Sequence, residues 1–306
     1  MSLRFGIIFL TCCLFPALAG ADEVEQGLKQ QFEGKTLVLR HPLEGSSMEF
    51  DADGKVLKGG DEGPWTVYGG VLIDDVALSP EKLSFKGRRI LFLFLNQQFT
   101  AMELKKRNPI LEPPFPPSVE LEIKLDRALD SADQAQTILG RVFALNNADL
   151  LDSIPDYWRD FLRDRLLYDP SAKPEAEFRW QPPPRTSVRK LAQNAGPDAT
   201  SGHQDDDKLP LVFRAGSGVT APRPTYTPEP KYSAAASYEK FQGVLVASVI
   251  IGTDGNIHSI RVIRPLGLGL DESARSMLQT WRFDPAKRDG KPVAVEMNIE
   301  VSFNLY

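Results

Sequence analysis

Apolar and polar residues alternate along the C-terminal end of the chain, where every odd position from Val293 to Leu305 is apolar. Successive side chains of a strand point to opposite faces of a sheet, so this pattern predicts one long strand with a single apolar face. Upstream, residues 243–264 have the pattern of a strand hairpin and residues 271–281 that of a short helix. We therefore predict a three-stranded antiparallel sheet with two helices, whose outer strand offers unpaired backbone groups to a partner.

Short β-compatible runs between turn residues predict a β-rich N-terminal domain. The expected strands are residues 36–40, 48–50, 56–57, 65–68, 71–78, 83–85, 90–95 and 118–125, with 90–95 as the buried central strand. Two covering helices are expected to follow. One begins with the capping pair Ser131 and Gln134, and the other spans residues 149–166. The pattern as a whole predicts a compact sheet or a small barrel.

A proline-rich stretch separates these two regions. Residues 168–230 hold 11 of the 24 prolines and the acidic run 205–207, a composition that buries too little apolar surface to fold by itself. We predict a linker over residues 168–227, in which residues 211–213 form a strand that docks on one of the domains. The fold class is then α+β, with domains over residues 22–167 and 228–306.

The first 21 residues have the pattern of a secretory signal peptide. A basic start with Arg4 precedes an apolar run over residues 5–18, and Ala17-Leu18-Ala19 resembles a small-residue cleavage site. The run is shorter than the about 20 residues that cross a bilayer, although a retained membrane anchor stays open as the alternative. Both cysteines, Cys12 and Cys13, lie in this segment, so a cleaved chain has no disulfide.

Charge and motifs favour a binding protein over an enzyme. The chain has 36 basic and 41 acidic residues without a basic stripe, which argues against a nucleic-acid partner. Its three histidines, His41, His203 and His258, share no metal-ligand spacing. The sequence has neither a glycine-rich phosphate loop nor a nucleophile elbow. We expect no catalytic residue, no metal site and no cofactor.

Motif residues follow Pro228 in a specific order, and each has a structural interpretation. Gly255 supplies a positive φ at a hairpin turn, Asp271 is expected to cap a helix, and Trp281 and Phe283 are expected to lie in the core. These residues include Gly243, Asp254, Gly255, Asp271, Trp281, Phe283, Pro285 and Gly290. In combination and order, they resemble the TonB C-terminal domain family.

The resemblance implies a periplasmic protein that binds an extended peptide of an outer-membrane receptor, or of another cell-envelope partner, by β-augmentation. By analogy, the partner-binding edge would be the last strand, with contacts at Val293, Val295, Glu296, Met297, Asn298, Ile299, Glu300 and Val301. The alternative is an inner-membrane energy transducer for transport across the outer membrane, in which residues 1–21 are retained as the anchor.

Overall fold

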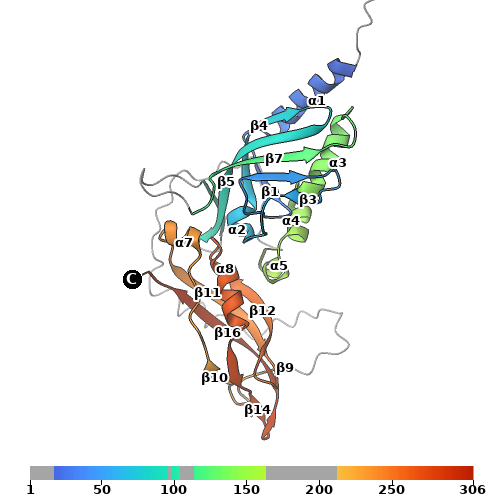
Figure 1. The fold of residues 1–306 in the computed structure, drawn as a ribbon. Helices are drawn as coiled ribbons and strands as arrows, with labels where there is room; N and C mark the ends of the chain where they lie inside the picture. Colours follow the sequence, from blue (N-terminus) through green and yellow to red (C-terminus); the bar gives the residue numbers. More distant parts are fainter. Residues whose placement is uncertain (1–16, 96–97, 104–113, 163–211, 306) are drawn as a thin grey trace, which may run out of the picture.

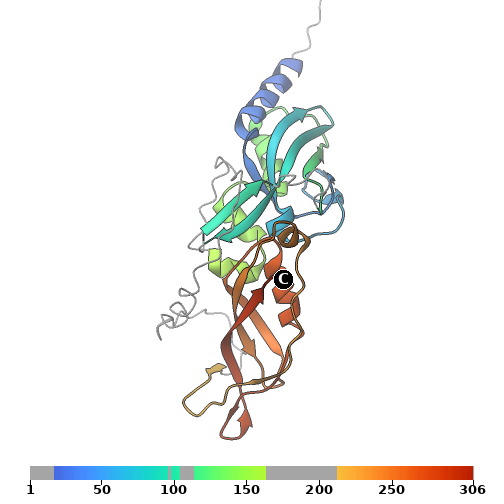
Figure 2. The same cartoon turned by 90° about the vertical axis from the view of Figure 1, so that its left-hand side faces the viewer.

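The computed structural model describes residues 17–95, 98–103, 114–162 and 212–305. The fold is α+β, with an N-terminal unit (described residues 17–162) and a C-terminal unit (residues 212–305). Figures 1 and 2 show the two units stacked end to end, with the N-terminal helix at one end and a small hairpin of the C-terminal unit at the other.

The N-terminal unit is built on one mixed sheet. The described elements in chain order are α1 (Ala17–Phe32), β1 (Thr36–Leu39), β2 (Ser47–Phe50), β3 (Val56–Lys58), α2 (Trp65–Tyr68), β4 (Gly70–Leu78), β5 (Lys82–Leu95), β6 (Gln98–Glu103), β7 (Ser118–Lys124), α3 (Ala132–Val142), β8 (Phe143–Ala144), α4 (Asn147–Ser153) and α5 (Asp156–Leu162). The strand order is β3-β2-β7-β5-β4-β1-β8, and β6 pairs with β5. The β2–β7 pairing is parallel.

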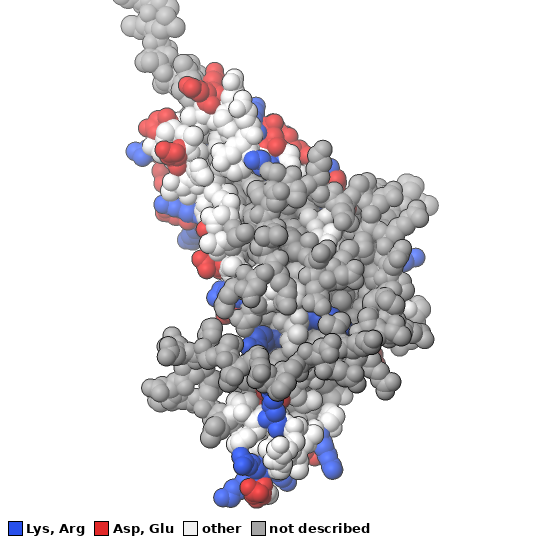
Figure 3. All heavy atoms as spheres, turned by 180° about the vertical axis from the view of Figure 1, so that it is seen from behind, with Lys and Arg blue, Asp and Glu red and all other residues white. Residues whose placement is uncertain are grey.

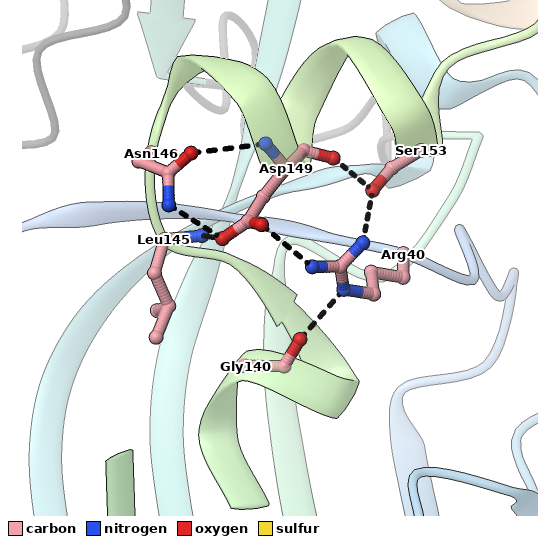
Figure 4. A network of polar contacts seen from close by, with 6 residues as sticks. All are labelled: Arg40, Gly140, Leu145, Asn146, Asp149 and Ser153. Carbon is pink, nitrogen blue, oxygen red and sulfur yellow. Dashed lines mark hydrogen bonds and ion pairs between the residues drawn. The ribbon is translucent and has the colours of Figure 1, made fainter. Parts of the chain in front are cut away.

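Helices cover both faces of this sheet. Leu37 and Leu39 of β1 pack in the cluster formed with α1 and α3, whereas Val38 between them packs in the cluster formed with α4 and α5. This is the alternation that a strand imposes on its side chains. Arg40, directly after β1, ties the two helical layers together (Figure 4): it donates to the Gly140 carbonyl at 2.7 Å and contacts Asp149 at 3.2 Å.

Two expected strands of this region need correction. Residues 65–68 form helix α2, in which Trp65, Thr66 and Val67 are buried, because tertiary packing overrides the β propensity of so short a segment. The expected strands 83–85 and 90–95 are a single strand, β5. The charged residues between them stay in the sheet because Arg88 pairs with Asp74 and Arg89 is buried against backbone carbonyls. Strand β6 was not expected.

The expected helix over residues 149–166 is two helices, α4 and α5, as far as its residues are described. They are separated at Pro155. The residue before a proline is forced towards an extended conformation, and Ile154 has φ −81° and ψ 152°. The expected cap of α3 is confirmed, since the Ser131 side chain accepts a hydrogen bond from the Gln134 amide.

The C-terminal unit has a four-stranded sheet of order β12-β11-β16-β9. Its elements are β9 (Val212–Arg214), β10 (Arg223–Tyr226), α7 (Ala234–Tyr238), β11 (Gly243–Ile251), β12 (Ile257–Arg264), α8 (Leu270–Leu278), β13 (Arg282–Asp284), β14 (Lys287–Arg288), β15 (Lys291–Pro292) and β16 (Ala294–Phe303). The expected three antiparallel strands are present as β12, β11 and β16. The fourth, β9, is the docking strand expected near residues 211–213 of the predicted linker, and it pairs parallel to β16.

The two units share one apolar core, in a contact that we call the joint. Strand β4 pairs with β5 only as far as Ile90, and the remainder of β5 reaches the C-terminal unit. There the Phe94 amide donates to the Leu266 carbonyl and the Leu268 amide to the Phe92 carbonyl, both at 3.0 Å. The N-terminal residues buried in this shared core are Val67, Leu91, Leu93, Met102 and Phe115. Local sequence patterns predict two domains but do not predict this contact.

The predicted boundaries of the signal peptide, the two domains and the linker stay predictions. Residues 1–16 and most of the predicted linker lie outside the described residues. Helix α1 begins at Ala17, upstream of the expected mature start, and contains the expected apolar positions Val24, Leu28 and Phe32, all buried.

Candidate partner-binding edge

Strand β16 has one fully paired side and one side that is paired only in part. On one side it pairs antiparallel with β11 from Val295 to Phe303. On the other side, β9 pairs with Ala294, Val295 and Glu296 alone. From Met297 to Phe303, no strand of the described part of the chain lies along this second side. The expected open edge therefore needs correction at Val295 and Glu296, whereas Met297, Asn298, Ile299, Glu300 and Val301 lie on its free part.

The side chains of β16 follow the expected alternation. Ile299, Val301 and Phe303 are buried in the core with the helices, and Asn298 and Glu300 are exposed on the opposite face. Val293 lies just before the strand and packs with Val295 in a small separate cluster. Along the free part of the edge, one face of the sheet is therefore apolar and the other face is polar.

The direction in which each backbone amide of β16 points can be inferred from Leu305, just beyond the C-terminal end of the strand. The Leu305 amide donates to the Gln242 side chain, at 3.2 Å, on the β11 side of the strand. Because amides of alternate residues point to opposite sides of a strand, odd-numbered amides face β11. The amides of Asn298 and Glu300 therefore face the free side.

The opposite edge of the sheet is β12, and helix α5 of the N-terminal unit packs against this strand.

A second expected site feature, the turn between β11 and β12, is structural. Gly255 has φ +77°, and a Cβ at this position would lie 1.9 Å from the Phe283 carbonyl oxygen. Asp254 holds the same turn by accepting from the Asn256 amide at 3.0 Å and contacting His258 at 2.9 Å, and the His258 contact holds the pKa of Asp254 well below its usual value.

Asp271 does not have the expected capping role. The N-cap of α8 is Gly269, with φ +76°, and the buried Asp271 carboxylate instead accepts from the amides of Leu266 and Gly267 at 3.0 and 2.6 Å. Burial raises the pKa of Asp271 well above its usual value, and the neighbouring Glu272 adds to this effect. Burial also raises the pKa of Glu272 to about 7. Both carboxyls lie at the joint, close to Tyr157 of α5.

The other residues of the motif are structural as well. Gly243 begins β11, where Leu266 packs so closely that a Cβ would lie 2.5 Å from its Cδ2 atom. Phe283 is buried, whereas Trp281 is only partly buried and donates from Nε1 to the Pro228 carbonyl at 3.2 Å. Pro285 is partly buried beside them, and Gly290 has φ +78° in the turn between β14 and β15.

The end of the C-terminal unit away from the joint is rich in exposed charge. Lys287, Arg288 and Lys291 of the β14–β15 hairpin are exposed, as is Asp289 between them. Basic side chains around an acidic one are visible at this end in Figure 3. This hairpin lies beside the start of β16, so the partly paired edge begins in a basic environment.

No group of three or more histidine, cysteine, aspartate or glutamate side chains is arranged to hold a metal ion in the part of the chain that the structure describes. Among the helices of these same residues, none is both long and apolar enough to cross a bilayer.

Comparison with known proteins finds similarity in the C-terminal unit. Residues 228–305 match the family model of the Gram-negative bacterial TonB protein C-terminal region. Among solved structures, the chain is similar to the C-terminal domain of TonB from Pseudomonas aeruginosa, determined by solution NMR. The two are 23% identical, with a TM-score of 0.23, and the similarity covers 30% of this chain and 92% of that chain. No curated protein matches the chain.

Proposed function

We propose that this protein is a non-catalytic, exported binding protein of the periplasm whose C-terminal unit binds an extended peptide of an outer-membrane receptor by strand addition. The partner strand would lie along β16 from Met297 to Phe303. The observation that carries the proposal is the free side of this strand, which leaves backbone groups available for pairing. The family match of residues 228–305 and the signal-like pattern of residues 1–21 support it.

Proline at an outward-facing position of β16 tests the proposal. Asn298→Pro and Glu300→Pro each remove an amide from the free side, and both side chains are exposed, so the core is left intact. The full chain is used as bait against outer-membrane extract, because the two units share a core. We expect both variants to lose capture of outer-membrane receptors, identified by mass spectrometry.

Asn298→Ala and Glu300→Ala are the matched controls, since alanine removes the same side chain but keeps the amide. They should capture receptors as the unaltered chain does. Undiminished capture by a folded proline variant would rule out strand addition at this edge.

A second function, an anchored energy transducer, is kept because helix α1 starts at Ala17 and so continues through the expected cleavage region. This transducer would retain residues 1–21 in the inner membrane and transmit force to the receptor. N-terminal sequencing of the protein isolated from cells separates the two proposals. A start near Ala21 or Asp22 removes the anchor, and a start at the initiator region keeps it.

A further inference from the structure

Strand β9 already makes, within the chain, the kind of pairing that we propose for a partner. Val212, Phe213 and Arg214 lie parallel to β16, opposite Ala294, Val295 and Glu296. The strand lies outside the segment that matches the family model, residues 228–305. It is therefore an added strand that occupies one end of the proposed binding edge.

Few side-chain contacts hold β9 in place. Val212 is 38% exposed and the Arg214 side chain is 71% exposed. Only Phe213 packs inward, against the cluster that contains Val295, with the Arg288 guanidinium 5.1 Å from its ring centre. Three backbone pairs and one half-buried aromatic ring make a weak attachment, which a longer strand could replace.

Glu296 offers a fixed negative charge to any strand in this position. Its Oε1 atom accepts from Ser248 at 2.8 Å and from Arg261 at 3.0 Å, so β11 and β12 hold the carboxylate. Its Oε2 atom lies 3.8 Å from Arg214. An exposed pair at this distance adds little to stability, but the carboxylate stays oriented without it. The site therefore suits a cation on the neighbouring strand.

The chain leaves β16 directly after Arg214 because its backbone turns. Gly216, Ser217 and Gly218 have φ values of 113°, 50° and 89°, and the Gly216 and Val219 backbones pair with each other. These left-handed residues end β9 opposite Glu296. A strand without this turn would continue along Met297 and the free part of the edge, and so make more backbone hydrogen bonds than β9 does.

We infer that β9 is a resident strand that the partner displaces, and that it shows which peptide the edge accepts. This inference rests on the proposed function. The partner strand runs parallel to β16, has a large apolar or aromatic residue at the place of Phe213 and a lysine or arginine at the place of Arg214, and continues along β16 to Phe303. Since β9 is tethered, its high effective concentration weakens the binding of a competing free peptide.

A peptide with the sequence of residues 208–216 tests the exchange in trans. The full chain with Phe213→Ser and Arg214→Ser vacates the site without touching β16. We expect this variant to bind the peptide at least about tenfold more tightly than the unaltered chain, measured by fluorescence anisotropy. In the unaltered chain, excess peptide should increase hydrogen exchange at the amides of residues 212–214. A peptide with Phe213→Ser and Arg214→Glu is the control and should not bind.

Equal binding by the two chains, or no binding by a vacated chain that circular dichroism shows to be folded, would overturn the inference. The outcome is separable from that of the proposed function. If exchange fails while Asn298→Pro still abolishes receptor capture, the edge binds a partner and β9 is a permanent strand. If exchange occurs but Asn298→Pro does not reduce receptor capture, β9 leaves its site and the proposed function is wrong.

Discussion

The guanidinium group of Arg275 in α8 lies over the ring of Tyr157 in α5, 5.0 Å from its centre, and so connects the two units of the chain. A cation over an aromatic face is an attractive contact. The same ring approaches Glu272, a carboxyl that is buried at the joint. Titration of this group should therefore affect how firmly the units pack.

Glu272→Gln is expected to remove part of the pH dependence of stability. The pKa of Glu272 is about 7 in the folded chain, against an ordinary value of 4.5. The folded state thus binds the proton more tightly, and stability falls as pH rises from about 4.5 to about 7. The variant should be more stable than the unaltered chain at pH 8, by on the order of 1–3 kcal/mol. Urea unfolding at pH 5, 6, 7 and 8 measures this.

At pH 5 the difference between the two chains should fall below about 1 kcal/mol, because Glu272 is protonated in the folded state and the pH is close to the unfolded pKa of 4.5. A variant that is less stable at pH 8 would contradict the role of burial. Asp271 titrates in the same direction, so the variant should keep part of the slope.

Arg89→Met is expected to destabilise the N-terminal unit strongly. The buried guanidinium donates to the carbonyls of Tyr68, Leu43 and Gly45 at 2.5–2.7 Å. Methionine would leave these acceptors without their donor, at a cost of about 3 kcal/mol. Arg88→Met is the control in the adjacent position: its ion pair with Asp74 is exposed and its ion pair with Glu103 is only partly buried, so the loss should be about 1 kcal/mol. Similar losses of stability in the two variants, measured by thermal unfolding, would contradict the larger contribution expected from the buried hydrogen bonds of Arg89.

Gly267→Ala should loosen the joint. Gly267 has φ +85°, and a Cβ would lie 2.5 Å from both the Leu93 Cα atom and the Phe92 carbonyl oxygen. Gly290→Ala is a control with the same backbone strain, since its φ is +78° and no atom lies within 4 Å of its added Cβ. We expect Gly267→Ala to cost about 2 kcal/mol more than Gly290→Ala, and to make the chain more sensitive to limited proteolysis. Equal losses of stability in the two variants would mean that the backbone at the joint shifts to accommodate the added methyl group.

Thr66→Val tests a polar contact of the joint. The Thr66 hydroxyl accepts a hydrogen bond from the Gly269 amide at 2.9 Å, in a buried position. Valine has nearly the same shape but leaves this amide without an acceptor, for an expected loss of about 1–2 kcal/mol. Thr137→Val in α3, which loses an exposed hydrogen bond to the Asp133 carbonyl, should change the free energy of unfolding by less than about 0.5 kcal/mol.

Local patterns were sufficient for much of the fold. The alternation from Val293 to Leu305 predicted β16 and its buried face, and Gly255 correctly marked the turn between β11 and β12. Prediction failed where contacts between residues far apart in the sequence determine the local conformation or the role of a side chain. Trp65 lies in a helix because it packs against Phe92, and Asp271 turns from a capping position to the amides of Leu266 and Gly267. No local pattern indicates a special role for Glu272, because only the packing of α5 buries its carboxyl group.

By itself the sequence determined most of the local elements, the α+β fold class and the resemblance of residues 228–306 to a known family, because side-chain periodicity and turn residues act over a few neighbouring positions. Tertiary structure alone decided that β5 joins the two units and that β9 occupies the first residues of β16. Both depend on pairing between segments far apart in the chain, whose register no local pattern specifies.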